Sequence, residues 1–218
     1  MNNINLKYIL PRVSSSVRNT EQITQSDVWL KDIQFERGQL YLLEACSGTG
    51  KSSLCSYIYG YRQDYEGQIT FDGKDISHIS TKELVNVRKQ ELSILWQELR
   101  LFPELTAMEN VIIKNKLTSY QPQRQIDEWF EMLGIADRKN YKIGRMSFGQ
   151  QQRVAMIRAL CQPFSFLFAD EPISHLDANN SQIMAKIMME EAHKQGAGVI
   201  ITSIGKHMSL DYDKAIHL

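Results

Sequence analysis

One segment of the sequence has the residue types and spacing needed to hold phosphate groups. It reads Ala45-Cys46-Ser47-Gly48-Thr49-Gly50-Lys51-Ser52-Ser53 and matches the pattern G-x-x-x-x-G-K-[ST], with Ala45 at the position of the first glycine. The segment follows an apolar stretch expected to be a strand and precedes a stretch expected to be a helix, as this pattern requires. Backbone N–H groups of such a turn and of the helix start point into one concavity and favour a polyphosphate.

Within this phosphate loop, defined as residues 45–53, single residues have separate expected roles. Gly48 and Gly50 let the backbone approach a phosphate closely. Lys51 can reach the β and γ phosphates, and the hydroxyl of Ser52 can ligate Mg²⁺. The loop therefore predicts a binding site for ATP with Mg²⁺.

A second segment carries the acidic groups that such a site needs. The apolar run 166–169 leads into Asp170, Glu171 and Pro172. A buried strand that ends in an aspartate at the sheet edge supplies a carboxylate to Mg²⁺, so Asp170 is a candidate metal ligand. Glu171 is a candidate general base for the attacking water. Pro172 ends the strand, because proline lacks the N–H that would continue the ladder.

The elements that position these groups alternate along the chain. Alternating apolar residues predict a strand over 4–10, with a polar loop over 14–27 behind it, and residues 80–160 read as mostly helical. Strands and helices that alternate in this way favour an α/β fold with a mostly parallel sheet and an antiparallel edge. The expected further strands are 28–35, 39–45, 68–71, 164–169, 198–202 and 215–218, and the expected helices are 51–59, 106–117, 125–133, 147–160 and 179–193.

Composition limits the classes of function. The 218 residues include 25 basic and 25 acidic side chains, so there is no strongly basic field for nucleic acid. No apolar run approaches the roughly 20 residues of a membrane-spanning helix, and the N-terminus lacks the apolar core of a secretory signal. Three cysteines fit neither a disulfide framework nor a zinc pattern, which favours free thiols in a reducing compartment.

Further motifs, in the expected order, resemble those of the ATP-binding cassette family from about residue 28 to the end. The stretch 146–153 (Met-Ser-Phe-Gly-Gln-Gln-Gln-Arg) resembles the signature LSGGQ-x-Q-R, and 174–177 (Ser-His-Leu-Asp) resembles the D-loop. Residues 95–97, 101–106 and 109–111 resemble the Q-loop and the segment behind it. Within the family, the sequence is most similar to the cassettes of lipoprotein-releasing, macrolide-exporter and cell-division transporters.

This resemblance implies one P-loop NTPase domain over 1–218, with a RecA-like core at about 1–96 and 161–218. A helical subdomain is expected as an insertion at about 97–160. Two such domains would pair head to tail around two ATP molecules, so that the signature of one subunit covers the γ-phosphate on the other. The implied nucleotide-binding residues are Ser47, Gly48, Thr49, Gly50, Lys51, Ser52, Ser53, Ser147, Gly149, Gln150 and Asp177. The implied catalytic residues are Glu171, Lys51, Gln97 and Ser203, and the implied metal ligands are Ser52, Gln97 and Asp170.

The resemblance further implies an ATPase that drives transmembrane permease subunits made by other chains, as a homodimer or a heterodimer. Such a chain would be cytoplasmic and held at the inner face of the cell membrane by its permease, with no nucleic acid and no insertion of its own. The alternative is a hydrolysis-impaired regulatory subunit, or one half of an asymmetric pair of cassettes. A cassette acting on DNA or ribosomes is disfavoured by the neutral charge.

Three departures from the family pattern bear on these expectations. Phe148 stands at the second glycine position of the signature pentapeptide, and Ser203 stands where the family has a histidine. His207, four residues on, is a candidate to reach back in its place. Tyr8 and Trp29 are candidates for the aromatic side chain that stacks on adenine, although packing in the core or at an edge is the favoured alternative for each.

Overall fold

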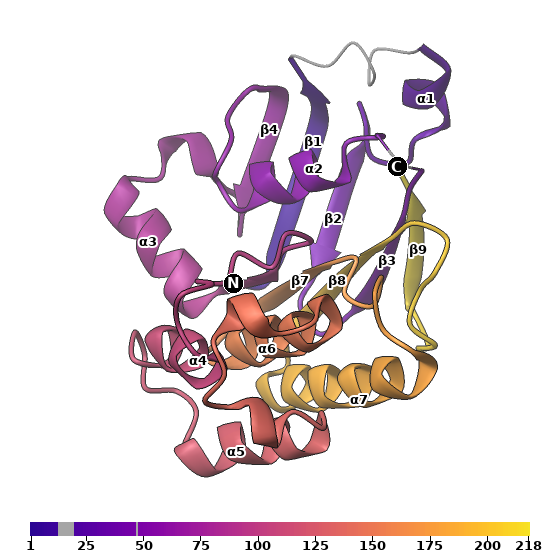
Figure 1. Cartoon of the computed structure of the whole chain (residues 1–218). Helices are drawn as coiled ribbons and strands as arrows, with labels where there is room; N and C mark the ends of the chain where they lie inside the picture. Colours follow the sequence, from indigo (N-terminus) through magenta and orange to yellow (C-terminus); the bar gives the residue numbers. More distant parts are fainter. Residues whose placement is uncertain (13–19, 47) are drawn as a thin grey trace.

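The computed structural model describes residues 1–12, 20–46 and 48–218, and these residues form two sheets and a set of helices (Figure 1). The first sheet is parallel and five-stranded, in the order β6-β7-β8-β3-β9. Its strands are β3 (Leu40–Glu44), β6 (Leu92–Leu95), β7 (Phe166–Asp170), β8 (Gly198–Ser203) and β9 (Lys214–His217). The second sheet is antiparallel and four-stranded, in the order β2-β1-β4-β5. It contains β1 (Asn3–Pro11), β2 (Asp32–Glu36), β4 (Tyr65–Phe71) and β5 (Lys74–Asp75).

Helices cover both faces of the parallel sheet. The α-helices are α1 (Thr20–Gln25), α2 (Lys51–Ile58), α3 (Thr81–Gln90), α4 (Ala107–Asn115), α5 (Gln123–Met132), α6 (Phe148–Leu160) and α7 (Ala178–Gln195). Helices α4 to α7 lie together on one face, and α2 lies on the other, towards the antiparallel sheet (Figure 1). Short 3₁₀ turns occupy Ile76–His78, Ala136–Arg138 and Ile143–Arg145. The α/β fold class expected from the sequence is therefore confirmed.

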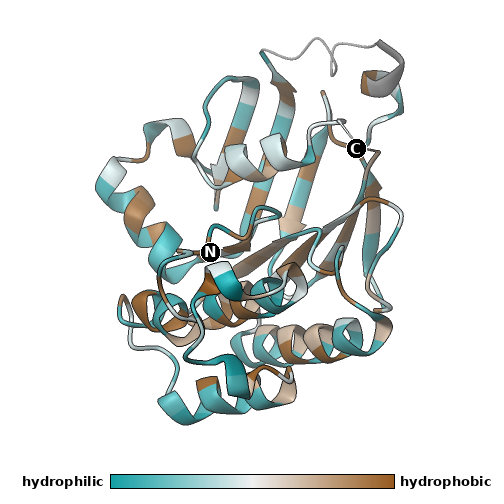
Figure 2. Cartoon of the chain, viewed as in Figure 1, coloured by the Kyte–Doolittle hydropathy of each residue, from teal (hydrophilic) through white to brown (hydrophobic). Residues whose placement is uncertain are grey.

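Alternation along β7 explains why the sheet separates two hydrophobic clusters. Successive side chains of a strand point to opposite faces, so a strand covered on both sides is apolar throughout. Phe166 and Phe168 pack with α2 and the antiparallel sheet, whereas Leu167 and Ala169 pack with α4 to α7. Hydrophobic residues accordingly gather on the strands of this sheet in Figure 2. The first cluster joins the helices to the sheet as one core, and the subdomain boundaries near residues 97 and 160 stay a prediction.

One sequence expectation about local structure is incomplete and another is wrong. The stretch 80–160 is mostly helical, as expected, but it also contains strand β6, because Leu92–Leu95 pairs in parallel with β7. Helix α1 also begins at Thr20, within the stretch 14–27 that was expected to be a loop; residues 13–19 lie outside the described part of the chain. Strand β1 differs from simple alternation as well. A register irregularity between Lys7 and Leu10 leaves Tyr8 62% exposed at a φ of 53°, while Ile9 is buried.

The helical pattern predicted around residue 130 is confirmed. Ile126 and Phe130 on one face of α5 are fully buried, as is Leu133 at its C-cap, and Trp129 is nearly so. No described helix combines the length and the apolar character that a membrane crossing demands.

The packing of α5 leads to a stability prediction. We expect Phe130→Ala to lower the free energy of unfolding by about 3–5 kcal/mol, because it removes a fully buried ring and leaves a cavity. Met132→Ala is the matched control, since Met132 is 41% exposed on the same helix and should change stability by less than about 0.5 kcal/mol. Urea unfolding followed by circular dichroism measures both. Equal losses in the two variants would contradict this account of α5.

Candidate functional site

The carboxyl ends of neighbouring parallel strands bring the predicted site residues to one edge of the sheet. β3 ends at Glu44, directly before the phosphate loop, and β7 ends at Asp170. β8 lies between them and ends at Ser203, whose carbonyl oxygen accepts a hydrogen bond of 3.1 Å from the N–H of Ala45. Ligand sites of parallel α/β sheets form outside such carboxyl ends, so this edge is the candidate site.

The phosphate loop has the backbone shape that the glycine pattern predicts. Gly48 and Gly50 have φ values of 84° and 101°, in the region that residues with a Cβ rarely adopt. Gly50 is the N-cap of α2, and no side chain caps that helix. Its first N–H groups are therefore open to an acceptor from outside the helix. Ser47, also predicted to bind nucleotide, lies outside the described residues.

The loop is fixed by contacts of its own. The hydroxyl of Thr49 donates to the carbonyl oxygen of Cys46 at 2.9 Å. The hydroxyl of Ser53 accepts a 3.0 Å hydrogen bond from Arg62, so this side chain is held by the protein itself. A hollow of about 630 Å³ adjoins the loop at Ala45, Cys46 and Thr49.

The acidic centre contains a buried carboxylate held by two hydroxyls. Asp170 is 1% exposed and accepts hydrogen bonds from Ser52, at 3.1 Å, and from Thr202. Burial raises the pKa of Asp170, and the hydrogen bonds from Thr202 and Ser52 oppose that rise. The hydroxyl and carboxylate oxygens of Ser52 and Asp170 are the hard donors that Mg²⁺ prefers. No cluster of three or more His, Cys, Asp or Glu that could hold a metal ion occurs among the described residues.

Glu171 sits beside this centre in a strained backbone conformation. Its φ is 48°, which is uncommon for a residue with a side chain and costs about 1–3 kcal/mol. The backbone is held in place because its N–H donates to Thr202 and its carbonyl oxygen accepts from Gln152 at 3.1 Å. The carboxylate of Glu171 lies 3.5 Å from the ammonium of Lys51, which is 6% exposed. Lys51, Ser52, Asp170 and Glu171 are thus brought together, as predicted.

The chain's similarity to known proteins agrees with this geometry. The profile of the ABC transporter family matches residues 30–174. The chain belongs to the ABC transporter family. It is 33% identical over 86% of its length to the uncharacterized ABC transporter ATP-binding protein YclH of Bacillus subtilis (strain 168), of which it covers 83%. It is 29% identical over 96% of its length to the macrolide export ATP-binding/permease protein MacB of Shewanella sp. (strain ANA-3), of which it covers 32%.

Solved structures agree with the fold of this cassette. The dimeric post-hydrolysis structure of the ATP-binding cassette MJ0796 bound to ADP and Pi superposes with a TM-score of 0.75. That comparison covers 92% of this chain and 87% of the other at 23% identity, and therefore concerns the fold alone. The cassette spans about a third of MacB and about half of another curated relative, so it corresponds to one part of those proteins.

The signature residues of the cassette lie at the start of α6. Ser147 is the N-cap of α6 in a reciprocal capping box with Gln150, at 3.0 and 3.3 Å, and Gly149 lies against the carbonyl oxygen of His175. Phe148 is 41% exposed, with its ring centroid 4.3 Å from that of His175. Among the described residues, no hydrogen bond or ion pair joins the signature to the phosphate loop of the same chain.

Asp177 lies at the start of the next helix of the cassette. It is the N-cap of α7, and its carboxylate accepts a 2.8 Å bond from the backbone N–H of Asn180. The bonds from Asn180, together with the charge of Arg153, lower the pKa of Asp177. The exposed side chain is thus kept ionised at the surface that also carries Ser147.

Three further candidate site residues of the cassette lie at or beyond the ends of β6 and β8. Gln97 is exposed just beyond β6, at the same sheet edge as Asp170. Ser203 is 2% exposed, and its hydroxyl donates to the carbonyl oxygen of Lys206 at 2.7 Å. His207 faces Glu44, with Nδ1 at 3.7 Å from the carboxylate. The sequence placed Ser203 at this edge, but its hydroxyl is already engaged within its own turn.

Trp29 is not an adenine-stacking surface in this cassette. It is 1% exposed, which agrees with the favoured alternative of a core position, while Tyr8 is 62% exposed. Instead, the indole N–H of Trp29 donates to the carbonyl oxygen of Thr49 at 3.2 Å, from inside the core beneath the phosphate loop. The hydroxyl of Ser26 holds the backbone at Trp29 in place, because it accepts hydrogen bonds from the N–H groups of Val28 and Trp29, each at 3.0 Å. Trp29 is therefore a positioning residue whose contact the sequence pattern does not reveal.

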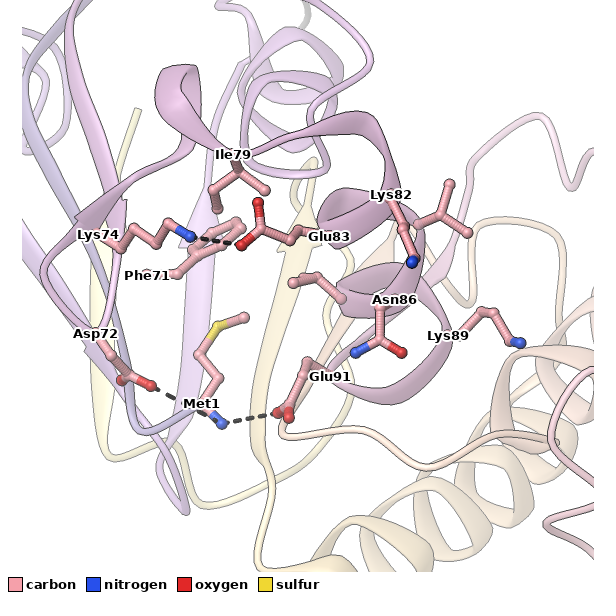
Figure 3. A pocket seen from close by; sticks show the side chains of 12 residues that line it. Met1, Phe71, Asp72, Lys74, Ile79, Lys82, Glu83, Asn86, Lys89 and Glu91 are labelled. Carbon is pink, nitrogen blue, oxygen red and sulfur yellow. Dashed lines mark hydrogen bonds and ion pairs between the residues drawn. The ribbon is translucent and has the colours of Figure 1, made fainter.

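A hollow elsewhere on the cassette does not have the character of the nucleotide site. It encloses about 740 Å³ between the β4–β5 hairpin and α3 (Figure 3), and no predicted site residue lines it. Several of its charged groups are already paired. Lys74 lies 2.8 Å from Glu83, and Glu91 lies 2.7 Å from the ammonium of Met1 (Figure 3).

The contact of Trp29 leads to a prediction on nucleotide affinity. We expect Trp29→Phe to weaken binding of Mg-ATP about three- to tenfold, because it keeps most of the packing but removes one hydrogen bond to the phosphate loop. Trp129→Phe is the control, since Trp129 is also buried but lies on α5. Isothermal titration calorimetry measures both affinities. Unchanged affinity in Trp29→Phe would show that the indole N–H does not position the loop.

Proposed function

We propose that this chain binds and hydrolyses Mg-ATP as a cassette pair and thereby drives a separate transmembrane permease. The observation that carries the proposal is the contact set at the sheet edge. Lys51 meets Glu171 at 3.5 Å while Ser52 meets Asp170 at 3.1 Å, beneath an uncapped helix start. These are the charge, the hydroxyl and the two carboxylates that phosphoryl transfer to water requires.

Each group has a role in the proposed reaction. The open N–H groups at the start of α2 hold the polyphosphate, and Lys51 neutralises its terminal charge. Mg²⁺, when bound by Ser52 and Asp170, would stabilise negative charge on the transferred phosphoryl group. Glu171 accepts a proton from the attacking water. The phosphate loop residues Gly48, Thr49, Gly50 and Ser53, with Ser47, line the phosphates, and Gln97 lies where it can respond to the attacking water.

Pairing of two cassettes supplies the groups that a single chain lacks. The start of α6 carries Ser147, Gly149 and Gln150 and is not bonded to the described part of the phosphate loop of its own chain. Asp177 is exposed nearby. In the proposed pair these residues cover the ATP bound to the other subunit. Removal of the γ-phosphate then weakens the contact between the two subunits and lets them separate. The partner is a second copy of this chain or a related cassette.

A groove beside the sheet is the proposed docking surface for the permease. It encloses about 210 Å³, and Tyr61 and Phe102 at its rim are 54% and 52% exposed. Its cations are Arg100, Lys114 and Arg158, and none of the described residues that line it is acidic. Burial, and then repulsion by Arg158, lower the pKa of Lys114 to about 8. A permease segment that carries apolar side chains and a carboxylate would complement this groove, and it would hold the cassette at the cytoplasmic face of the membrane.

The decisive experiment replaces the general base. We expect Glu171→Gln to slow ATP turnover by about 10²- to 10⁴-fold and to accumulate a dimer in ATP but not in ADP, because the γ-phosphate is no longer removed. Phosphate release and size-exclusion chromatography with light scattering measure the two effects. Lys51→Ala is the reference variant without nucleotide binding. A Glu171→Gln protein that binds ATP yet stays monomeric would exclude the sandwich mechanism.

A second candidate function is a nucleotide-binding regulatory subunit, or the weak half of an asymmetric pair. Two observations favour it: the bulky Phe148 in the signature, and the hydroxyl of Ser203, which is engaged within its own turn. Phosphate release by the wild-type protein separates the two functions. Turnover near background with intact ATP binding would support the regulatory subunit.

The docking surface leads to a separate prediction. We expect Arg100→Glu to reduce the membrane-bound fraction of the chain in its own cells at least about tenfold, because like charges across an interface cost several kcal/mol. The guanidinium of Arg100 lies 3.7 Å from the centroid of Trp96 in the groove. Arg124→Glu, at a side chain 90% exposed on α5, is the control and should stay membrane-bound. Quantitative immunoblots of membrane fractions give the result, and equal fractions for both variants would place the docking surface elsewhere.

A further inference from the structure

Lys206 is a cation near the nucleotide site that the sequence motifs do not assign. It lies in the turn that follows β8, three residues beyond Ser203, whose carbonyl oxygen is bonded to the first residue of the phosphate loop. The turn is tight, since the N–H of Lys206 donates to the carbonyl oxygen of Ile204 at 2.8 Å around Gly205, which has a φ of 73°. This reversal directs the chain back towards the loop that follows Glu171.

The ammonium of Lys206 has a neutral partner only. It donates to the carbonyl oxygen of Leu176 at 2.7 Å, in the segment between Glu171 and α7. Among the described residues, no carboxylate lies within ion-pair distance of it. A hydrogen bond between an ammonium and an anion is roughly twice as strong as one between neutral groups. An anionic group that entered this edge of the sheet would therefore compete well for Lys206.

The neighbouring polar groups of the same turn are directed elsewhere. The hydroxyl of Ser203 donates to the carbonyl oxygen of Lys206 itself. The ring of His207 lies near Glu44, with Nδ1 at 3.7 Å from the carboxylate. Within this turn, Lys206 is thus the charged side chain that has no anionic partner among the described residues.

We propose that Lys206 contacts the terminal phosphate of bound ATP, as a second positive charge in addition to Lys51. The inference rests on the proposed function, since it concerns the same nucleotide site. Lys206 leaves the carbonyl oxygen of Leu176 when the phosphate arrives and returns to it after the phosphate is lost. A contact of this kind distinguishes ATP from ADP, because ADP lacks the terminal phosphate.

The test compares ATP with ADP in a protein that does not consume the nucleotide. In the Glu171→Gln background, we expect Lys206→Met to weaken ATP binding about tenfold and ADP binding less than about twofold. Lys206→Arg should retain most of the affinity for ATP, because it keeps the charge. Lys186→Met is the matched control, since Lys186 lines the same hollow but lies on α7 and is ion-paired with Glu190 at 3.9 Å. Competition with a fluorescent nucleotide measures every affinity.

Two results would overturn the inference. One is an unchanged preference for ATP over ADP in Lys206→Met, and the other is an equal loss in Lys186→Met, which would indicate a general effect of surface charge. Failure of the proposed function looks different, because the parent Glu171→Gln protein would then bind neither nucleotide. The inference alone fails under three conditions that hold together: the parent protein binds ATP, the Lys51→Ala variant does not bind ATP, and the Lys206→Met variant binds ATP as tightly as the parent.

Discussion

The buried carboxylate of Asp170 is the group on which the arrangement of the site depends. A carboxylate that is 1% exposed is costly unless its oxygens are paired. Here Ser52, from the helix that follows β3, and Thr202, from β8, donate to its two oxygens. One side chain therefore ties together the carboxyl ends of β7 and β8 and the first turn of α2. Burial still raises the pKa of Asp170, so a cation next to its carboxylate would stabilise the ionised form. The hydrogen bonds that hold this carboxylate and its proposed role as a metal ligand therefore require the same geometry.

The conformation of Glu171 depends on this arrangement in turn. A left-handed glutamate persists only where its surroundings hold it. Thr202, which donates to Asp170, also accepts from the N–H of Glu171, and Gln152 of α6 binds the carbonyl oxygen. Gln152 belongs to the helix that the signature begins, so the position of the candidate base is linked through α6 to the surface proposed to meet the second cassette. A shift of that helix would be transmitted to Glu171 by a single hydrogen bond.

Motifs in contiguous sequence were predictable, whereas contacts between distant segments were not. The phosphate loop and the end of β7 are local patterns, and their convergence follows from the parallel sheet. Strand β6 was missed because its four residues, Leu92–Leu95, lie between helical patterns and are assigned only by pairing with β7. The register irregularity in β1 turns the side chain of Tyr8 towards solvent, and the alternation of apolar residues in the sequence does not reveal this. Trp29 and Lys206 act through bonds to Thr49 and Leu176, at sequence separations of 20 and 30 residues.

The ion pair between Lys51 and Glu171 joins the proposed phosphate-binding cation to the proposed general base. Both side chains are largely buried, at 6% and 12% exposure, so each is the partner that offsets the desolvation of the other. A polyphosphate that takes Lys51 removes that partner from Glu171. The freed carboxylate is then available to a water molecule at the moment when a γ-phosphate is present to be attacked. In the proposed mechanism, the contact of Lys51 with Glu171 thus exchanges for a contact with the γ-phosphate, and this exchange releases the base.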